Sequence, residues 1–514
     1  MDKLILSFDL GTQSARALLV SPKGDILFKA KKTFAEPYFS KAPGWAEQSA
    51  DFYWKQFCEA SLELKQMAGE AWDNIAAVTS STIRDTIVCL DKENNVLGDV
   101  IIWLDTRKAV CPPLPAGQQA LFTIAGAMNT VQTQRASSHV NWLAYQDKER
   151  WDKTAKISYI SGWLNYKFSG VLVESTAGMI GHLPFDSKSR SWMKAGDILR
   201  AVFALDTGRQ VALVPPGSEI GSITSEAAAA TGIKAGIPYI VAGSDKGCET
   251  LGLSCHDRAS AAISFGTTAT VQFSTEQYFE PQPHLPAYPA IMPGFYNPEM
   301  EIYRGYWLLS WFKKEFAAKE VLEAEQKGVS AEHILDARLK EVPAGCDGLI
   351  MQPFFTPGAS MPFAKGAVLG FSDVHTRIHL YRAIIEGINF ALMEGLYQME
   401  KRGKQKIEKL YVAGGGSQSD EVCRITANMF GLPVYRGSTF EATGLGAAIA
   451  AFVSLKDFAS YEEAIKAMVH IKDEFTPNAK ESRIYQELYA EVFEKIFSKL
   501  SPLYEVIDRV LLLN

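Results

Sequence analysis

One short pattern occurs twice in this chain, and it limits the folds that the chain can adopt. Residues 8–20 read FDLGTQSARALLV, and residues 261–273 read AAISFGTTATVQF. Each segment has a Gly-Thr pair between two arms of strand-forming residues, which is the pattern of a β-hairpin. The two glycines, Gly11 and Gly266, are 255 positions apart in a chain of 514 residues. Because each hairpin stands at the head of one half, we predict an internal duplication.

Strand and helix signals alternate along the rest of the chain. Residues 26–32 and 75–80 read as strands, and residues 51–67 have the apolar spacing of a helix. This alternation indicates an α/β architecture, which we divide into domains at residues 1–248 and 249–514. Towards the C-terminus we predict a proline-rich loop over residues 281–298 and helices over residues 306–319, 377–398 and 461–513.

Composition and charge exclude several classes of protein. The net charge is −6, and no run of lysine and arginine indicates a nucleic-acid partner. No apolar run is long enough to span a membrane, and the acidic Asp9 interrupts the segment where a signal peptide would be apolar. The seven cysteines form no CxxC pair, which favours reduced thiols over disulfides. We therefore expect a cytoplasmic protein with small-molecule ligands, and we leave a homodimer open.

The turn of the first hairpin has the groups that can hold a phosphate. Gly11, Thr12 and Gln13 form the turn, Asp9 precedes it and Arg16 follows it. A glycine turn lets backbone N–H groups approach an anion closely, and an arginine can neutralise phosphate charge. The carboxylate of Asp9 could hold Mg²⁺ through water, because hard cations prefer oxygen ligands. Taken alone, the same residues also fit an ordinary hairpin turn.

The turn of the second hairpin repeats this arrangement without the acid. Gly266, Thr267 and Thr268 follow a predicted strand, and they suit the far side of a phosphate chain. The sequence contains no GxxxxGKS or GxxxxGKT, and no GxGxxG follows a strand. P-loop kinases and Rossmann dehydrogenases are therefore disfavoured.

A third glycine turn lies between a predicted strand over residues 409–412 and a helix that begins near Asp420. It contains Gly415, Gly416 and Ser417. Consecutive glycines at this position leave room for a flat base or a ribose, and the helix N-terminus favours negative charge. The alternative is a flexible loop, although GGGS between a strand and a helix is seldom a linker.

A second group of residues fits a polyhydroxyl ligand. Asp245 follows an apolar strand and is placed as a base at a strand end. Arginine and aspartate can bond neighbouring hydroxyls, while tryptophan packs on the carbon face of a sugar. The alternatives are a capping residue and surface ion pairs. The candidate residues for this ligand are Arg84, Asp85, Trp103, Asp105 and Lys246.

These motifs, in this order, resemble the FGGY family of carbohydrate kinases, which belongs to the actin/Hsp70/hexokinase superfamily. The resemblance covers residues 3–455. Its strongest parts are FDLGTQSARA, PGWAEQ, IIWLDTR, IPYIVAGSDKGCETLG, SFGTTA, GAVLGFSDVHTRIHLYRAIIEGINFAL, VAGGGSQSDEVCRITANMFGLPV and EATGLGAAIAA.

The resemblance implies two RNase H-like domains, with ATP and a sugar meeting in the cleft between them. Asp245 matches the base of the family, and Asp9 matches its acid near Mg²⁺. The first hairpin (Gly11, Thr12, Arg16) would hold the phosphates from one side, and the second (Gly266, Thr267) from the other. The third turn (Gly415, Gly416, Ser417) would line the adenosine pocket.

The resemblance also limits the range of acceptor molecules that we expect this chain to phosphorylate. Arg84-Asp85 is similar to the Arg-Glu pair of glycerol kinases, but Gln134 and Lys246 stand where those enzymes carry tyrosine and glutamine. These departures favour a bulkier acceptor, and we predict phosphorylation of a primary hydroxyl of a pentulose such as xylulose. The alternatives are a glycerol or other polyol kinase, and a catalytically silent sugar or nucleotide sensor on the same fold. The retained Asp9 and Asp245 speak against the sensor.

Overall fold

The computed structural model describes residues 3–356, 361 and 363–512 of the chain. By the contacts within it, the chain forms two compact units. Unit 1 consists of Met1–Ser254, Pro286–Asn297 and Glu441–His470. Unit 2 consists of Cys255–Leu285, Pro298–Phe440 and Ile471–Asn514. The boundary at residue 248 stays a prediction, and each unit is described separately below.

Unit 1 is built on a six-stranded sheet with the order β13-β14-β5-β1-β2-β3. The predicted hairpin is confirmed, because β1 and β2 pair antiparallel around Gly11. The strands β5 and β14 continue the sheet parallel to β1. The bounds are β1 Leu4–Leu10, β2 Ser14–Val20, β3 Ile26–Thr33, β5 Ile75–Thr82, β13 Glu219–Ser222 and β14 Pro238–Ser244.

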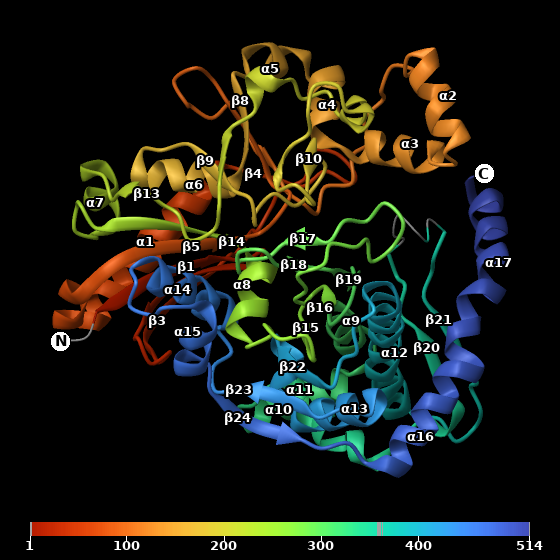
Figure 1. Cartoon of the computed structure of the whole chain (residues 1–514). Helices are drawn as coiled ribbons and strands as arrows, with labels where there is room; N and C mark the ends of the chain where they lie inside the picture. The colour runs from red at the N-terminus through yellow and green to blue at the C-terminus, as the bar shows by residue number, and fades with distance from the viewer. Residues whose placement is uncertain (1–2, 357–360, 362, 513–514) are drawn as a thin grey trace. The chain divides into compact units, whose positions relative to one another are not determined.

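Both faces of this sheet are covered, which explains why every residue of β1 is buried. Successive side chains of a strand point to opposite faces. Phe8 packs with Phe57 of α1 (Ala50–Ala68) and Phe168 of α6 (Ile160–Ser169) in one core cluster. Ile5 lies in a second cluster with Leu445 of α14 (Ala442–Ser454) on the other face. Figure 1 shows α6 and α14 on opposite sides of this sheet. Asp9 shares the alternation of Ile5 and therefore lies on the α14 face.

A smaller four-stranded sheet, in the order β4-β7-β6-β8, completes unit 1 with short helices and strand pairs. The strands are β4 Glu47–Gln48, β6 Ile87–Leu90, β7 Val100–Ile101, β8 Lys156–Tyr159, β9 Val173–Ser175, β10 Phe185–Asp186, β11 Ser191–Trp192, β12 Ala212–Val214, β17 Tyr288–Pro289 and β18 Tyr296–Asn297. The helices are α2 Ala116–Ile124, α3 Met128–Ser137, α4 His139–Gln146, α5 Lys148–Lys153, α7 Ser225–Thr231, α8 Asp245–Gly252 and α15 Tyr461–Met468.

Unit 2 repeats the topology of the large sheet. Its six-stranded sheet has the order β19-β16-β15-β22-β23-β24. The hairpin of β15 and β16 is antiparallel, and β22 and β23 continue parallel to β15. Strand order and directions match those of unit 1, which supports the predicted duplication. The bounds are β15 Ser260–Phe265, β16 Ala269–Phe273, β19 Glu299–Ile302, β22 Lys409–Ala413, β23 Val434–Gly437 and β24 Ile471–Phe475.

Long helices surround the sheet of unit 2. The longest, α12 (Arg377–Gly403), confirms the helix predicted over residues 377–398, and most of its first six turns is buried. The predicted helix over residues 306–319 is divided at Ala317 into α9 and α10. The remaining bounds are α9 Trp307–Phe316, α10 Ala318–Lys327, α11 Ala331–Arg338, α13 Asp420–Phe430, α16 Ala479–Leu488, α17 Glu494–Leu512, β20 Ile350–Gln352 and β21 Ala367–Leu369.

The C-terminal prediction needs a correction. Residues 461–513 were predicted as helical throughout, but Ile471–Phe475 forms β24, which pairs antiparallel with β23. This strand is short and mostly polar, so its pairing partner rather than its own pattern defines it. The helix before it, α15, belongs to unit 1, and residue 513 lies outside the described residues. Across residues 3–356, 361 and 363–512, none of the helices combines the length and apolarity needed to cross a bilayer.

Candidate functional site

The sheet of unit 1 brings three predicted site segments to one edge. The parallel strands β1, β5 and β14 all end there, because Asp9 pairs with Ser81 and Ser244 pairs with Thr82. Ligands of α/β sheets bind outside the carboxyl ends of parallel strands. Asp9, Arg84 and Asp245, which are far apart in sequence, are therefore neighbours in this unit.

Asp245 is the first residue of α8, directly after the end of β14. Its Oδ1 accepts a hydrogen bond from the backbone N–H of Lys246 at 2.8 Å, and Nε of Arg84 lies 3.9 Å from the same oxygen. The side chain keeps 26% of its surface exposed. Burial raises the pKa of this carboxyl, while Arg84 and Lys246 oppose the shift. The result is a carboxylate that a ligand can reach and that is more basic than an ordinary aspartate.

Asp9 and Arg16 form an ion pair across the first hairpin. Nη1 of Arg16 donates to Oδ2 of Asp9 at 2.9 Å, and its Nε lies 3.2 Å from Glu441. Burial raises the pKa of Asp9 to about 6, Arg16 opposes this shift, and the charges of Asp245 and Glu441 add to it. Asp9 is therefore a buried carboxylate whose charged partner, Arg16, also contacts Glu441.

The turn of the first hairpin contacts one of the predicted sugar residues. The backbone N–H of Gly11 donates to the carbonyl of Ser14 at 3.0 Å, which closes the turn, and Gln13 is exposed. The indole N–H of Trp103 donates to Oγ1 of Thr12 at 3.0 Å. The predicted phosphate turn and the predicted sugar residue Trp103 are thus in direct contact.

Arg84 and Asp85 follow the end of β5 and have partners that the sequence did not indicate. The guanidinium of Arg84 lies over the ring of Tyr288 at 5.7 Å. The carboxylate of Asp85 binds Nδ1 of His182 at 2.9 Å. Tyr288 and His182 come from segments far along the chain and belong to no recognisable motif, so no local pattern could have identified them.

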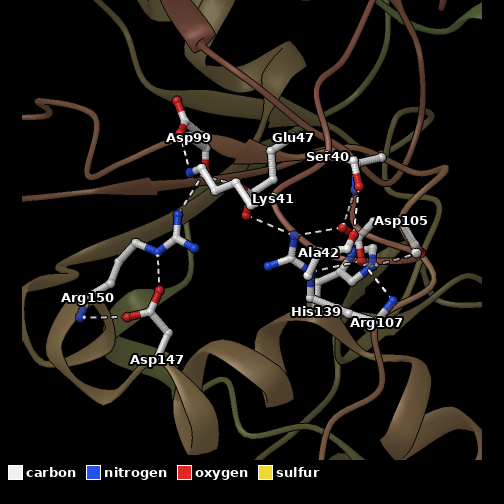
Figure 2. A network of polar contacts seen from close by, with 12 residues as sticks. Ser40, Lys41, Ala42, Glu47, Asp99, Asp105, Arg107, His139, Asp147 and Arg150 are labelled. Atoms are coloured by element: carbon white, nitrogen blue, oxygen red, sulfur yellow. Dashed lines mark hydrogen bonds and ion pairs between the residues drawn. The ribbon is translucent and has the colours of Figure 1, made fainter.

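Asp105 is the centre of a buried polar network. Its carboxylate accepts hydrogen bonds from the backbone N–H of Ala46 at 2.6 Å and from Nε and Nη2 of Arg107 at 2.8 and 2.7 Å. Nη2 of Arg107 also donates to Glu47 at 2.8 Å. Figure 2 shows these groups converging on the arginine. The role of Asp105 as a substrate ligand stays a prediction. Its contacts favour a structural role, in which it ties Arg107 to the backbone at Ala46.

Lys246, the other predicted sugar residue, points its ammonium group at its own helix. Its Nζ lies 2.9 Å from Oε2 of Glu249, one turn further along α8. Both side chains are mostly buried, at 17% and 10% exposure. This pair lies next to Asp245, whose pKa the charge of Lys246 lowers and the charge of Glu249 raises.

Unit 2 contains a cavity of about 990 Å³ at the carboxyl ends of β15 and β22. Gly266 and Thr267 of the second hairpin line it together with Gly415 and Gly416 of the third turn. The structure therefore unites two turns that were predicted to bind one nucleotide. Helices α9, α11 and α13 complete the wall, and the polar or aromatic lining residues include Tyr306, Ser330, Glu332, His333, Asp336, Lys340, Tyr381, Gln418, Ser419 and Arg424.

Within the second and third turns, two of the predicted nucleotide residues do not line this cavity. Oγ1 of Thr268 donates to the carbonyl of Tyr303 at 3.2 Å. Ser417 is buried, and its Oγ donates to the carbonyl of Gly414 at 2.7 Å. Both hydroxyls therefore bond to the backbone near a turn.

Each glycine of the third turn has different surroundings, which determine whether a side chain would fit there. Gly414 has φ +83°, and a Cβ there would lie 2.6 Å from the carbonyl carbon of Phe265, so only glycine allows the two turns to approach. A Cβ on Gly416 would lie 2.2 Å from the ring of Tyr306. A Cβ on Gly415 would meet no atom within 4 Å, because this residue faces open space.

Comparisons with known proteins agree with this arrangement. The chain matches the N-terminal domain of the FGGY family of carbohydrate kinases over residues 4–252 and its C-terminal domain over residues 261–455. It is 24% identical to a xylulose kinase of Bacillus subtilis (strain 168) over 512 residues, covering 98% of each chain. It is 28% identical to an autoinducer-2 kinase of Escherichia coli (strain K12), covering 94% of this chain and 92% of that one.

A solved structure shares the fold. The crystal structure of a xylulose kinase from Rhodospirillum rubrum has a TM-score of 0.83 at 24% identity, covering 98% of this chain and 100% of that one. With both family domains matched and the strand-end residues and glycine turns in place, the chain belongs to the FGGY family of carbohydrate kinases.

Proposed function

We propose that this sugar kinase transfers the γ-phosphoryl group of ATP to a primary hydroxyl of a pentulose such as xylulose. The observation that carries the proposal is the environment of Asp245. A partly exposed carboxylate with a raised pKa stands at a helix N-terminus, 3.9 Å from Arg84 and at the same sheet edge as Asp9. A phosphoryl-transfer site needs such a group to accept the proton of the attacking hydroxyl.

In this proposal the nucleotide is assigned to the cavity of unit 2 and the acceptor sugar to residues of unit 1. The cavity of unit 2 holds the nucleotide, with Gly266 and Thr267 at the phosphates and the third turn beside the adenosine. In unit 1, we assign the turn Gly11–Gln13 and Arg16 to phosphate binding as well. The acceptor sugar binds at Arg84, Asp85 and Trp103, next to Asp245.

Asp245 orients the acceptor hydroxyl and takes its proton as the oxygen attacks phosphorus. Even with a raised pKa, a carboxylate is a weak base towards an alcohol, so the proton moves late. Most of the acceleration then comes from positioning of the hydroxyl and from neutralisation of charge on the phosphoryl oxygens. Arg84 keeps Asp245 ionised, since its charge lowers the pKa of that carboxyl.

Asp9 is suited to a magnesium ion that arrives with the nucleotide. Magnesium is commonly bound through one or two carboxylates and the substrate phosphates rather than by a complete protein cage. The buried carboxylate of Asp9, at the end of a strand and beside the first hairpin turn, fits this mode. When bound, Mg²⁺ would supply positive charge to the phosphate oxygens, and Asp9 with Arg16 would hold it beside the first hairpin.

A screen of acceptors tests the proposed function. The purified protein is incubated with Mg-ATP and a panel of ketoses, polyols and aldonates, and ADP release is measured for each. We expect the highest kcat/KM for a pentulose. Preference for glycerol or another polyol would replace the proposed acceptor, and ATP binding without ADP release for any acceptor would favour the sensor.

Replacement of Arg84 separates the acceptor site from the nucleotide site. We expect Arg84→Ala to raise the KM for the acceptor about tenfold or more, because a charged hydrogen-bond donor is removed from that site. The KM for ATP should change much less. Steady-state kinetics with each substrate varied in turn measures both constants, and equal effects on the two would remove Arg84 from the acceptor site.

The pKa of Asp245 gives a pH dependence with a definite sign. Only the ionised carboxylate accepts a proton, so kcat/KM for the acceptor should fall as the pH falls through the pKa of Asp245, which burial raises above its ordinary value. Arg84 opposes this shift. The acid limb of the pH profile should therefore move to higher pH in Arg84→Ala. An unchanged limb would contradict the assignment of this limb to Asp245.

A further inference from the structure

Asp85 is held in a backbone conformation that aspartate rarely adopts. Its φ of +45° lies in the left-handed region, three residues beyond the end of β5. Strained residues of this kind persist where surrounding contacts impose them, and they gather at functional sites. The neighbouring Arg84 is the residue that contacts Asp245. Asp85 is thus fixed next in sequence to the residue that contacts the proposed base.

The contacts that fix Asp85 come from residues 181 and 182. Nδ1 of His182 lies 2.9 Å from Oδ2 of Asp85, and the backbone N–H of His182 donates to Oδ1 at 3.5 Å. Gly181 has φ +143°, and a Cβ there would lie 2.3 Å from Oδ1 of Asp85. Only glycine permits this approach, so the backbone of residues 181 and 182 is shaped around the carboxylate.

The pair is accessible and carries unused hydrogen-bonding capacity. Asp85 and His182 expose 16% and 32% of their side chains. No hydrogen bond from the described residues reaches Nε2 of His182, although Nδ1 is occupied by Asp85. A ligand could therefore meet a carboxylate oxygen and an imidazole nitrogen at the same place.

The charges around His182 favour its protonated form. Burial lowers the pKa of His182, but the carboxylate of Asp85 outweighs this effect and raises it above the ordinary value, while Lys108 opposes the rise. His139 faces the same pair, and burial lowers its pKa. Tyr159 also faces Asp85, and burial raises its pKa well above the ordinary value, so the phenol stays neutral.

We infer that Asp85 and His182 bind the acceptor as one unit and that His182 is a specificity-determining residue for the sugar. In this arrangement Asp85 accepts a hydrogen bond from an acceptor hydroxyl. Nε2–H of the imidazolium donates to a second oxygen of the same molecule, and an oxygen that only accepts, such as a keto or carboxylate oxygen, suits it best. The inference rests on the proposed function and concerns the choice among its acceptors.

The conservative variant His182→Asn tests this inference. An asparagine amide can replace Nδ1 towards Asp85, but it has no group at the position of Nε2 and does not titrate. We expect the KM for a ketose to rise about tenfold, the loss expected for one hydrogen bond from a charged donor, while the KM for ATP stays unchanged. The preference for a ketose over its matched alditol should shrink by the same factor. His470→Asn is the control, because His470 is exposed in the same unit and its Nε2 bonds the carbonyl of Lys23.

The pH profile distinguishes this role from a merely structural one. In the natural protein the KM for the ketose should increase as the pH rises through the pKa of His182, because the donor proton at Nε2 is lost. This limb should be absent in His182→Asn. Unchanged KM values together with a retained limb would overturn the inference, whereas absence of ADP release from every acceptor in the natural protein would overturn the proposed function beneath it.

A histidine titration keeps the inference testable if the variant folds poorly. NMR of the natural protein and of Asp85→Asn would follow the imidazole protons of His182. We expect its pKa to fall in Asp85→Asn, since the carboxylate raises it. An unchanged pKa would show that the two groups are not coupled and would contradict their action as a unit.

Discussion

Asp245→Asn should abolish nearly all acceptor-dependent ADP formation. We expect kcat to fall about 1,000-fold, the range in which loss of a positioned proton acceptor acts. The asparagine can keep the hydrogen bond from the backbone N–H of Lys246, so the start of α8 should stay intact. ATP binding should be unchanged, because the cavity assigned to the nucleotide lies in unit 2.

Coupled-enzyme kinetics and calorimetric titration with ATP measure the two outcomes for Asp245→Asn. Asp197→Asn is a matched control in the same unit, since Asp197 is exposed and its side chain accepts from the backbone of Leu199, a contact that asparagine can also make. Turnover of Asp245→Asn near that of the natural protein would refute the base assignment.

The second large effect is expected at Gly415, where a side chain can be added without displacing protein. Its added Cβ would meet no atom within 4 Å, and its φ is not in the left-handed region. Because Gly415 lines the cavity of unit 2, a leucine there would occupy space assigned to the nucleotide. We expect Gly415→Leu to raise the KM for ATP about tenfold or more, since steric exclusion acts directly on binding.

Measurements of thermal unfolding and of ATP binding distinguish loss of the nucleotide site from loss of folding in Gly415→Leu. The melting temperature of Gly415→Leu should match that of the natural protein. Gly196→Leu provides the control, because Gly196 is exposed in unit 1 and its Cβ also meets open space. Normal ATP affinity in Gly415→Leu would remove the third turn from the nucleotide site.

Local patterns in the sequence were enough to predict both hairpins and the third glycine turn. A hairpin is defined by a glycine turn and its two flanking strands, and all of this information lies within about fifteen residues. The same holds for the strand, glycine turn and helix around Gly415. The proximity of Asp9, Arg84 and Asp245 could also be anticipated, because each residue lies at or just after the carboxyl end of a predicted strand.

Other parts of the site depend on contacts that no local pattern records. His182 and Tyr288 reach Asp85 and Arg84 from distant segments, so only the fold reveals them. The bonds of Asp105 to Arg107 were also unexpected, since an Asp-Thr-Arg sequence does not show which partners its charges will find. The polar strand β24 was missed because its pairing with β23, rather than its composition, makes it a strand.

Residues 441–470 belong to unit 1 although they come late in the chain, and this order has a consequence for biosynthesis. Helix α14 covers one face of the first sheet, where Leu445 packs in a cluster with Ile5 and Leu18. Residues 441–470 follow most of unit 2 in the chain. A nascent polypeptide therefore leaves that apolar face bare until translation is almost finished, and chaperone protection during this interval would reduce aggregation. Truncated products that end before residue 441 should be insoluble for the same reason.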